Sequence, residues 1–251
     1  MVSFKDYDRQ KEKLQMHYSK GYTMRAAICC TAVLWTVLVL SAGCAGLASF
    51  GDSGEMPLLF EADFEDGNLD AWQATDPNAW RIEEGRGGKV LAQFKQSDYE
   101  PPVRSPYNIN LIKDVEVRSF GLELKIRSTT KDYGHRDLCL FFAYRDPSHF
   151  YYVHIANTAD AHANSIFIVD GKPRVSIAKT RTEGTKWDDD WHTVRLVRDT
   201  NKSTIEVFFD GGAEPIMTAV NSFLQWGRVG VGSFDDTGQF DDIRLWGISK
   251  K

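Results

Sequence analysis

Acidic residues alternate with apolar ones where the β-rich part of the chain begins. Glu61, Asp63 and Glu65 are separated by single residues. In an extended strand, residues two apart point to the same face, so these three carboxylates would lie side by side. Carboxyl groups with unequal pKa values can serve as general acid and nucleophile. The spacing therefore suggests acid–base catalysis as one hypothesis, although the sequence offers no convincing catalytic pair.

A second group of polar residues lies in the middle of the chain. Tyr152 and His154 share one face of a predicted strand, opposite Tyr151, Val153 and Ile155. If the latter three face the core, Tyr152 and His154 look onto the opposite face, where a ligand could lie. Aromatic rings stack on sugar rings, and His, Asn, Asp and Arg side chains pair with hydroxyl groups.

The next extended segment continues this polar pattern. Asp160, His162 and Asn164 alternate along it, and His135 and Arg136 lie upstream. A transition-metal site with His154 and His162 as ligands is one alternative, and an ordinary solvated strand edge is another. A glycan groove is the interpretation that we adopt, and its predicted residues are Arg136, Tyr152, His154, His162, Asn164 and Trp187.

The tryptophans divide between packing and binding. Trp187 stands beside a charged turn, where an exposed ring could serve as a platform for a sugar. Trp72 and Trp80 are expected to be packing residues of the first hairpin. Cys139 lies in an apolar run and is interpreted as a buried, inert thiol.

Elements that would position these residues are strands. Apolar residues make up 42% of the chain and aromatic residues 12%, which suits sheets. Period-two alternation recurs with turn signals between the runs, and no stretch of the body offers an amphipathic helix of three turns. The sequence therefore predicts an all-β, two-sheet antiparallel sandwich. A net charge of −5 with no basic face argues against nucleic acid as a partner.

The order of several short motifs carries a resemblance. Residues 142–153 resemble the central hairpin of concanavalin A-like, laminin-G-like jelly rolls, the lectin/glucanase fold family. Residues 190–198 resemble that family's Trp-His strand, and residues 227–232 and 240–246 resemble its last two strands. The likeness spans most of residues 58–247 and implies a jelly roll.

This resemblance also implies two sites. In many related carbohydrate-binding modules the first and last strands lie together, and their acidic residues hold a structural calcium ion. The equivalent residues here are Asp63, Glu65, Asp241 and Asp242. Ca²⁺ takes six to eight oxygen ligands, which clustered carboxylates supply; a solvated acidic rim is the alternative. The Glu61–Glu65 motif is similar to the catalytic motif of laminarinase-type hydrolases. In those enzymes the motif lies on a central strand, well inside the domain, whereas here it opens the predicted domain.

The N-terminal region reads as an export signal. Arg25 precedes an uncharged run over residues 26–43, and small residues end it. The ending resembles the lipobox of bacterial lipoproteins, which implies lipid attachment at Cys44, with Ser41 at a position usually held by Leu. Simple cleavage and a retained anchor are the alternatives. We assign residues 24–43 to the signal, 44–57 to a tether and 58–248 to the sandwich, and residues 1–23 to a mis-assigned start or a cytoplasmic extension.

Together these observations predict a lipid-anchored protein of the bacterial cell envelope that binds a glycan and carries a structural calcium ion. A glycosidase-type enzyme, similar to the 3-keto-disaccharide hydrolases, is the main alternative. An envelope protein-interaction domain is a second one. Fold alone does not decide among them, and the sequence leaves the oligomeric state open.

Overall fold

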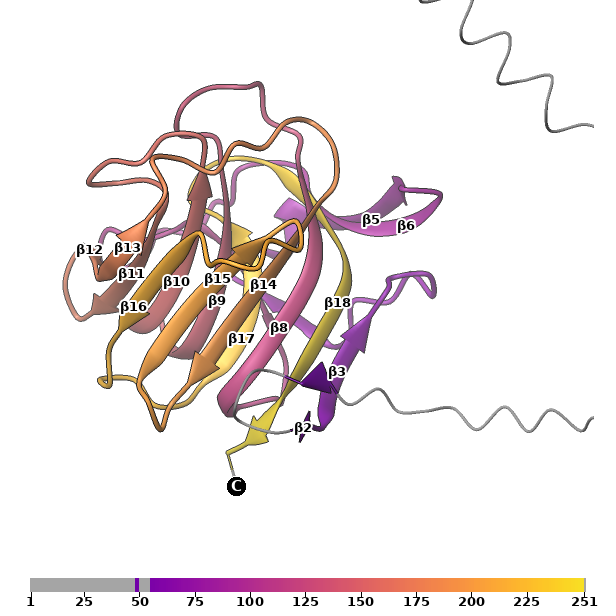
Figure 1. Ribbon diagram of the computed structural model, residues 1–251. Helices are drawn as coiled ribbons and strands as arrows, with labels where there is room; N and C mark the ends of the chain where they lie inside the picture. Colours follow the sequence, from indigo (N-terminus) through magenta and orange to yellow (C-terminus); the bar gives the residue numbers. More distant parts are fainter. Residues whose placement is uncertain (1–47, 50–54, 251) are drawn as a thin grey trace, which may run out of the picture. The chain divides into compact units, whose positions relative to one another are not determined.

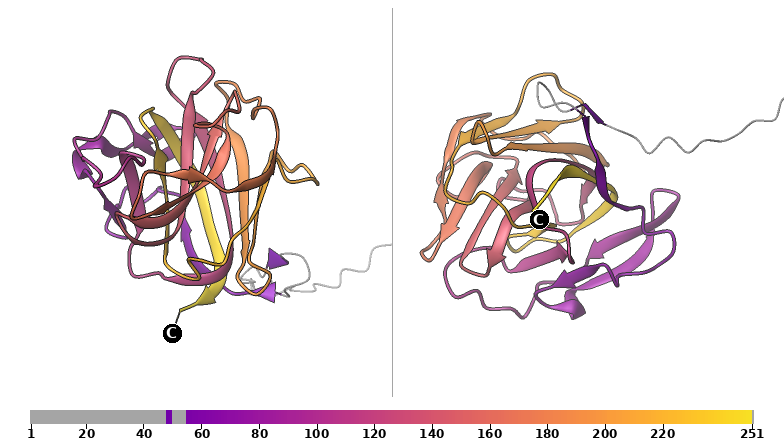
Figure 2. Two further views of the ribbon diagram at one scale, coloured as in Figure 1. Left: turned by 90° about the vertical axis from the view of Figure 1, so that its left-hand side faces the viewer. Right: turned by 90° about the horizontal axis from the view of Figure 1, so that it is seen from below.

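Antiparallel strands build the computed structural model, which describes residues 48–49 and 55–250 (Figure 1). One sheet has seven strands in the order β12 (Val175–Ser176), β11 (Ser165–Asp170), β10 (His149–Ala156), β9 (Asp137–Asp146), β17 (Arg228–Ser233), β7 (Asn108–Ile112) and β4 (Trp72–Ala74). The other has nine: β13 (Ala178–Arg181), β16 (Met217–Val220), β15 (Thr204–Phe209), β14 (His192–Asp199), β8 (Val117–Ser128), β18 (Gly238–Ser249), β6 (Gly88–Gln93) and β5 (Trp80–Gly85), with β3 (Leu58–Ala62) also paired to β18. The expected all-β, two-sheet jelly-roll sandwich is confirmed (Figure 2).

The burial of individual strands follows from their residue patterns. In β14, buried and half-buried residues alternate strictly, as expected for a strand with one face on the core. In β10, seven of eight residues are buried, so both faces of that strand are covered. The seven-stranded sheet is therefore covered on both faces around β10.

Two apolar clusters flank the seven-stranded sheet. The larger one fills the space between the sheets and includes Tyr151, Val153 and Ile155. The smaller one lies on the outer face of the seven-stranded sheet and includes Phe150, Tyr152 and Phe167. Residues 94–107 connect β6 to β7 and cover this outer face, with Val103 packed against the smaller cluster.

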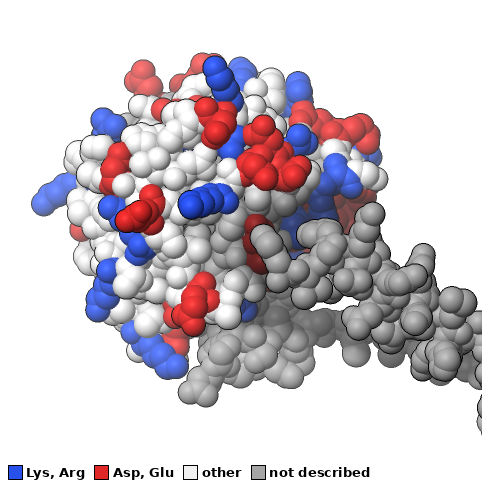
Figure 3. Space-filling view, turned by 45° about the horizontal axis from the view of Figure 1, so that its top comes forward, with Lys and Arg blue, Asp and Glu red and all other residues white. Residues whose placement is uncertain are grey.

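Several loops meet at one end of the sandwich, which we call the loop end. Ser128 at the end of β8 pairs with Gly238 at the start of β18, and Asn108 at the start of β7 pairs with Ser233 at the end of β17. The loops 129–136, 157–164, 182–191 and 234–237 therefore gather there. Seen toward this end, the surface carries groups of acidic side chains among scattered lysines and arginines (Figure 3).

The predicted tether contains some regular structure. β1 (Ala48–Ser49) and β2 (Glu55–Met56) pair as a short ribbon, and Met56 is buried against Trp246. The predictions for residues 1–43 and for Cys44 fall outside the described residues. Among the residues that are described, no helix is long and apolar enough to span a membrane.

Candidate functional site

The four carboxylates predicted to bind calcium lie at the same part of the nine-stranded sheet. β3 pairs with β18, and Ala62 lies opposite Ile243, so Asp63 and Glu65 follow directly beside Asp241 and Asp242. The first and last strands of the sandwich do lie together. Asp242 has a positive φ of 49°, and the register of β18 shifts there, so the strand bulges at this pair.

An arginine already neutralises this part of the site. Arg86, at the tip of the β5–β6 hairpin, donates through Nη1 to Asp241 Oδ2 at 3.0 Å and to Asp242 Oδ2 at 2.7 Å. The Glu65 carboxylate accepts from the Lys89 backbone N–H, and Asp63 caps its own loop by accepting from the Glu65 N–H. Within the described residues, these four do not form a convergent set of metal ligands. Arg86 lies beside Asp241 and Asp242, where the cation was expected, and calcium binding by the four carboxylates stays a prediction.

The catalytic interpretation required Glu61, Asp63 and Glu65 to lie on one face of a single strand, and the structure does not place them so. β3 ends at Ala62, and Phe64 has a positive φ of 60°, so the three carboxylates are not carried on one strand. Glu61 is instead paired with Arg244, whose Nε lies 2.7 Å from Glu61 Oε1.

The expected glycan groove over Tyr152 and His154 is closed. Both side chains face away from the inter-sheet core, as the alternation predicts, but Tyr152 has no exposed surface and His154 is only 4% exposed. The segment 94–107 covers this face, and Arg174 donates to the Tyr152 hydroxyl at 2.7 Å. The prediction of an open face was wrong because a connecting segment, which strand periodicity does not report, lies over it.

Three further predicted sugar contacts have structural roles. Arg136 is fully buried and donates through Nη2 to the backbone carbonyls of Trp187 and Asp188. The Trp187 ring is 4% exposed and belongs to the main core, so it is not the exposed platform that the sequence predicted. Asn164 is buried at a φ of 48° and accepts from the Thr185 hydroxyl at 2.8 Å.

His162 is the one predicted contact with an exposed side chain. Its backbone N–H donates to Asp160, whose other carboxylate oxygen lies 2.7 Å from His135 Nε2. His162 and Asp160 thus lie on the surface of the loop end. Their role in glycan binding stays a prediction.

A pocket opens at the edge of the sandwich beside β4 and β5. This edge pocket has a volume of about 390 Å³ and is lined by Leu69, Trp72, Gln73, Ala74, Pro77, Trp80, Asn110 and Lys113. Trp72 and Trp80 were expected to be packing residues of the first hairpin. Both do pack in the core, but they lie in opposite sheets rather than in one hairpin. The short 3₁₀ helix η2 (Pro77–Ala79) carries the chain from one sheet to the other.

Two polar groups in this pocket have no partner. The Trp80 indole nitrogen and the Asn110 side-chain oxygen are buried, and neither has a hydrogen-bond partner among the described residues. Asn110 is only 1% exposed. Buried polar atoms are normally satisfied, because an unmet one costs about 1–3 kcal/mol. The residues that line the edge pocket therefore include one buried donor and one buried acceptor that lack a partner among the described residues.

A more polar pocket adjoins the first. It has a volume of about 450 Å³ and shares Gln73 and Lys113 with the edge pocket; its remaining lining residues are Asp114, Glu116, Arg228, Ser249 and Lys250. Arg228 donates to the Gln73 side-chain oxygen. The two pockets form a surface that changes from aromatic to charged over a short distance.

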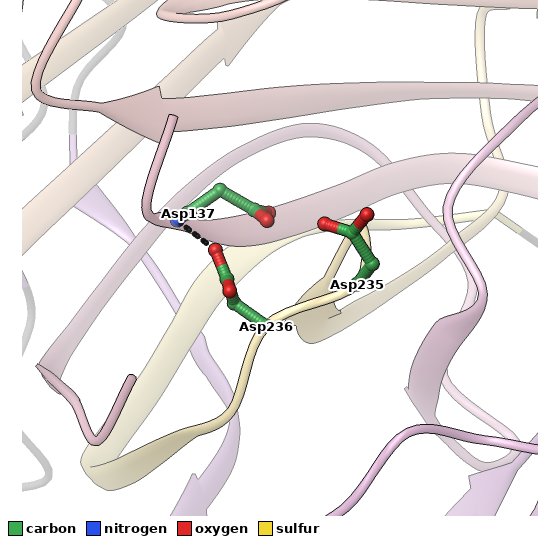
Figure 4. Close-up of side chains that lie close together, drawn as sticks. All are labelled: Asp137, Asp235 and Asp236. Atoms are coloured by element: carbon green, nitrogen blue, oxygen red, sulfur yellow. Dashed lines mark hydrogen bonds between the residues drawn. The ribbon is translucent and has the colours of Figure 1, made fainter. Parts of the chain in front are cut away.

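Sequence reasoning missed a second cluster, at the loop end. We call Asp137, Asp235 and Asp236 the acidic triad; one carboxylate oxygen of each lies within 4.8 Å of the others (Figure 4). Asp236 accepts from the Asp137 backbone N–H and from the Tyr133 hydroxyl, both at 2.8 Å. The signal in the sequence was a charged residue opening an apolar strand, together with an Asp pair in a short turn.

The electrostatics of the acidic triad are unfavourable as they stand. Burial, and then the neighbouring charges of Asp236 and Asp235, raise the pKa of Asp137 well above its usual value. Partial desolvation of its carboxyl group and the charge of Asp236 also raise the pKa of Asp235, and the charges of Arg174 and Arg104 oppose that rise. Burial lowers the pKa of His154 to about 3, so its imidazole is neutral at physiological pH.

Comparisons with known proteins agree with the fold. No family model matches the chain, and no curated protein matches it in sequence. The structure is similar to a carbohydrate-binding module from Bacillus subtilis (TM-score 0.50, 16% identity, 70% of this chain and 96% of that one). It is similar to the winged bean acidic lectin, solved with methyl-α-D-galactose (0.51, 12%, 76% and 98%), and to the GH43 protein BlXynB from Bacillus licheniformis (0.51, 14%, 74% and 39%). At these identities the likeness establishes a shared lectin-like β-sandwich.

Proposed function

We propose that this domain binds a carbohydrate in the edge pocket. The observation that carries the proposal is the lining of the edge pocket: it includes two tryptophans, each 6% exposed, and the residues of two buried atoms that lack a hydrogen-bond partner among the described residues, Trp80 Nε1 and Asn110 Oδ1. Sugar sites combine apolar ring surface with a few fixed donors and acceptors, because a sugar ring has apolar C–H faces and a rim of hydroxyls. The fold's similarity to a carbohydrate-binding module and a lectin adds support.

The adjoining polar pocket would receive the next sugar unit. Lys113 and Gln73 stand between the two pockets, and Arg228 fixes the Gln73 amide. Amides and cationic side chains both hydrogen-bond hydroxyl groups, and the cations also attract carboxylates. The ligand that fits best is therefore an oligosaccharide of at least two units.

The test compares the full-length protein with two variants on a glycan array, followed by calorimetric titration with the retained glycan. Asn110→Leu keeps the approximate shape but removes the amide, and Trp80→Phe keeps an aromatic ring but removes the donor. We expect each to weaken binding at least about tenfold, the effect of losing roughly 1.4 kcal/mol. Asn201→Ala, in an exposed turn, is the control and should bind normally.

Stability measurements separate loss of the site from loss of the fold. Because the Asn110 amide oxygen is unsatisfied, Asn110→Leu should melt at the same temperature as the wild type or higher. Unchanged glycan binding in both variants would contradict the edge pocket as the site. Release of free sugar would instead support the glycosidase alternative, and binding of no glycan would favour the interaction domain.

We also propose that the protein is exported and anchored through lipid on Cys44. The uncharged segment and the small residues before Cys44 support this. Metabolic labelling with a radioactive fatty acid should mark the wild type and not Cys44→Ser, which should also leave the membrane fraction. Labelling of that variant would overturn the assignment.

A further inference from the structure

We infer that the acidic triad and His154 bind one divalent transition-metal ion at the loop end of the sandwich. This site goes beyond the proposed glycan binding and does not depend on it. Three elements supply its residues: Asp137 and His154 lie on the neighbouring strands β9 and β10, and Asp235 and Asp236 lie in the turn between β17 and β18.

The carboxylates are placed as a ligand set. In Figure 4 the Asp137 and Asp235 carboxylates point toward each other, while Asp236 is held against the start of β9 by the Asp137 N–H. Asp137 is fully buried, and its Oδ1 atom has no hydrogen-bond partner among the described residues. In the part of the chain that the structure describes, no lysine or arginine forms an ion pair with the triad. A cation between the carboxylates would satisfy Oδ1 and offset their repulsion.

His154 is an independent indication of a ligand. Its side chain is 4% exposed, and Nδ1 is buried without a partner. Nε2 lies 3.8 Å from Asp137 Oδ2, a separation too long for a hydrogen bond. No side chain of the described residues forms a hydrogen bond with this imidazole, and Nε2 is close enough to Asp137 for both to bind one ion.

The donor types select the class of ion. Carboxylate oxygens alone suit Ca²⁺ or Mg²⁺, whereas an imidazole nitrogen beside carboxylates suits Zn²⁺ or Mn²⁺. The nearby Cys139 is not assigned as a ligand, because its thiol donates to Asp137 Oδ2 at 3.2 Å. The site is therefore one nitrogen with up to three carboxylates.

Bound metal would fix the loop end mechanically. The Asp236 carboxylate that would enter the site also accepts from Tyr133, a residue 45% exposed on the 129–136 loop. The Phe234 N–H donates to Asp137 Oδ2 at 2.7 Å and joins the turn to β9. An ion here would connect one surface loop, one turn and two central strands.

The test uses the full-length protein, purified in detergent and stripped with a chelator. Zn²⁺ and Mn²⁺ are titrated by calorimetry, and the metal retained after dialysis is counted by mass spectrometry. We expect one ion per chain and a higher melting temperature. Asp235→Asn, chosen because Asp235 is exposed and its change should not disturb folding, and His154→Gln should each weaken binding at least about tenfold. Asp70→Asn, an exposed acid outside the triad, should bind like the wild type.

Cobalt provides a spectroscopic test of the ligands. The Co²⁺ form should show visible bands that change in His154→Gln, without the near-ultraviolet charge-transfer band of a thiolate ligand. The absence of stoichiometric uptake, or equal affinity in Asp235→Asn and the wild type, would overturn the site. Binding of Ca²⁺ that His154→Gln leaves unchanged, without Zn²⁺ or Mn²⁺ binding, would overturn the choice of ion. Asn110→Leu should keep full metal binding, so the two proposals can fail separately.

Discussion

Asp76 shows how one side chain can hold a whole segment in place. It is buried, and it accepts from the Asn78 N–H at 3.0 Å as the cap of η2 and from the Asp98 N–H at 3.1 Å. The first of these bonds positions the turn beneath the edge pocket, and the second fixes the start of the covering segment 94–107. The Asp98 N–H bond, together with the Asn78 bonds, lowers the pKa of Asp76 below its usual value despite the opposing effect of burial.

Replacing Asp76 should therefore give a pH-dependent loss of stability. Since the folded state binds the Asp76 proton less tightly than the unfolded state, the stabilisation is present above the ordinary aspartate pKa and is lost as pH falls below it. We expect Asp76→Ala to lower the free energy of unfolding by about 1–2 kcal/mol at pH 7. Urea titrations at pH 7 and pH 3 measure this, and the difference from the wild type should shrink at pH 3. Asp66→Ala, at an exposed loop carboxylate, is the matched control.

The residue scale is also where sequence reasoning failed most. Arg136, Asn164 and Trp187 were assigned to sugar binding from their types, yet each is buried and holds a loop or the core. A residue's chemistry does not reveal which loop will lie over it. Asn110 and Asp137 were overlooked because a polar residue in an apolar run looks like an interruption of the strand, whereas here it faces a cavity or a cluster.

At the scale of elements, the β5–β6 hairpin is fastened to the last strand by Arg86. Its guanidinium bridges Asp241 and Asp242, two adjacent carboxylates at a bulge. Burial and Asp242 raise the pKa of Asp241, and Arg86 opposes that rise. Repulsion between these carboxylates was expected to be offset by Ca²⁺, and in the structure the Arg86 guanidinium offsets it at Asp241 and Asp242.

Removal of the Arg86 guanidinium should leave the repulsion between the Asp241 and Asp242 carboxylates uncompensated. We expect Arg86→Ala to lower the free energy of unfolding by about 1–2 kcal/mol at neutral pH and low salt. Added calcium should leave the wild type's melting temperature unchanged, as measured by scanning calorimetry. Arg118→Ala, at an exposed position of β8, should have little effect. A wild-type melting temperature that falls when calcium is chelated would restore the predicted calcium site.

The strands were easier to predict than the surfaces between them. Period-two patterns and apolar runs in the sequence located β8, β10, β14 and β18. Strict alternation of burial is seen in β14, whereas β10 is buried on both faces. The covering segment 94–107 forms no strand or helix, so it has no periodic pattern of apolar residues. The closure of the outer face therefore could not be predicted from the sequence. Trp72 and Trp80 do pack in the core as expected, but their assignment to one hairpin was wrong because the chain changes sheets between them.

For the whole molecule, the described sandwich depends on its core rather than on disulfides. Cys139 is a free, fully buried thiol whose pKa burial raises well above the usual value. We expect it to react with a thiol reagent only when the sandwich opens. In a Cys44→Ser background that also lacks Cys29 and Cys30, labelling kinetics should follow unfolding across a denaturant series. Rapid labelling in the native protein would show that the loop end opens locally near the acidic triad.

The two tryptophans of the edge pocket come from opposite sheets, which gives a bound molecule a role beyond occupancy. Such a molecule would touch both layers of the sandwich at once and act as a wedge between them. By thermodynamic linkage, the binding free energy that comes from contacts with both layers would stabilise the sandwich against separation of the two sheets. Core substitutions far from the pocket, if they change how the layers sit against each other, should then alter affinity without touching the ligand.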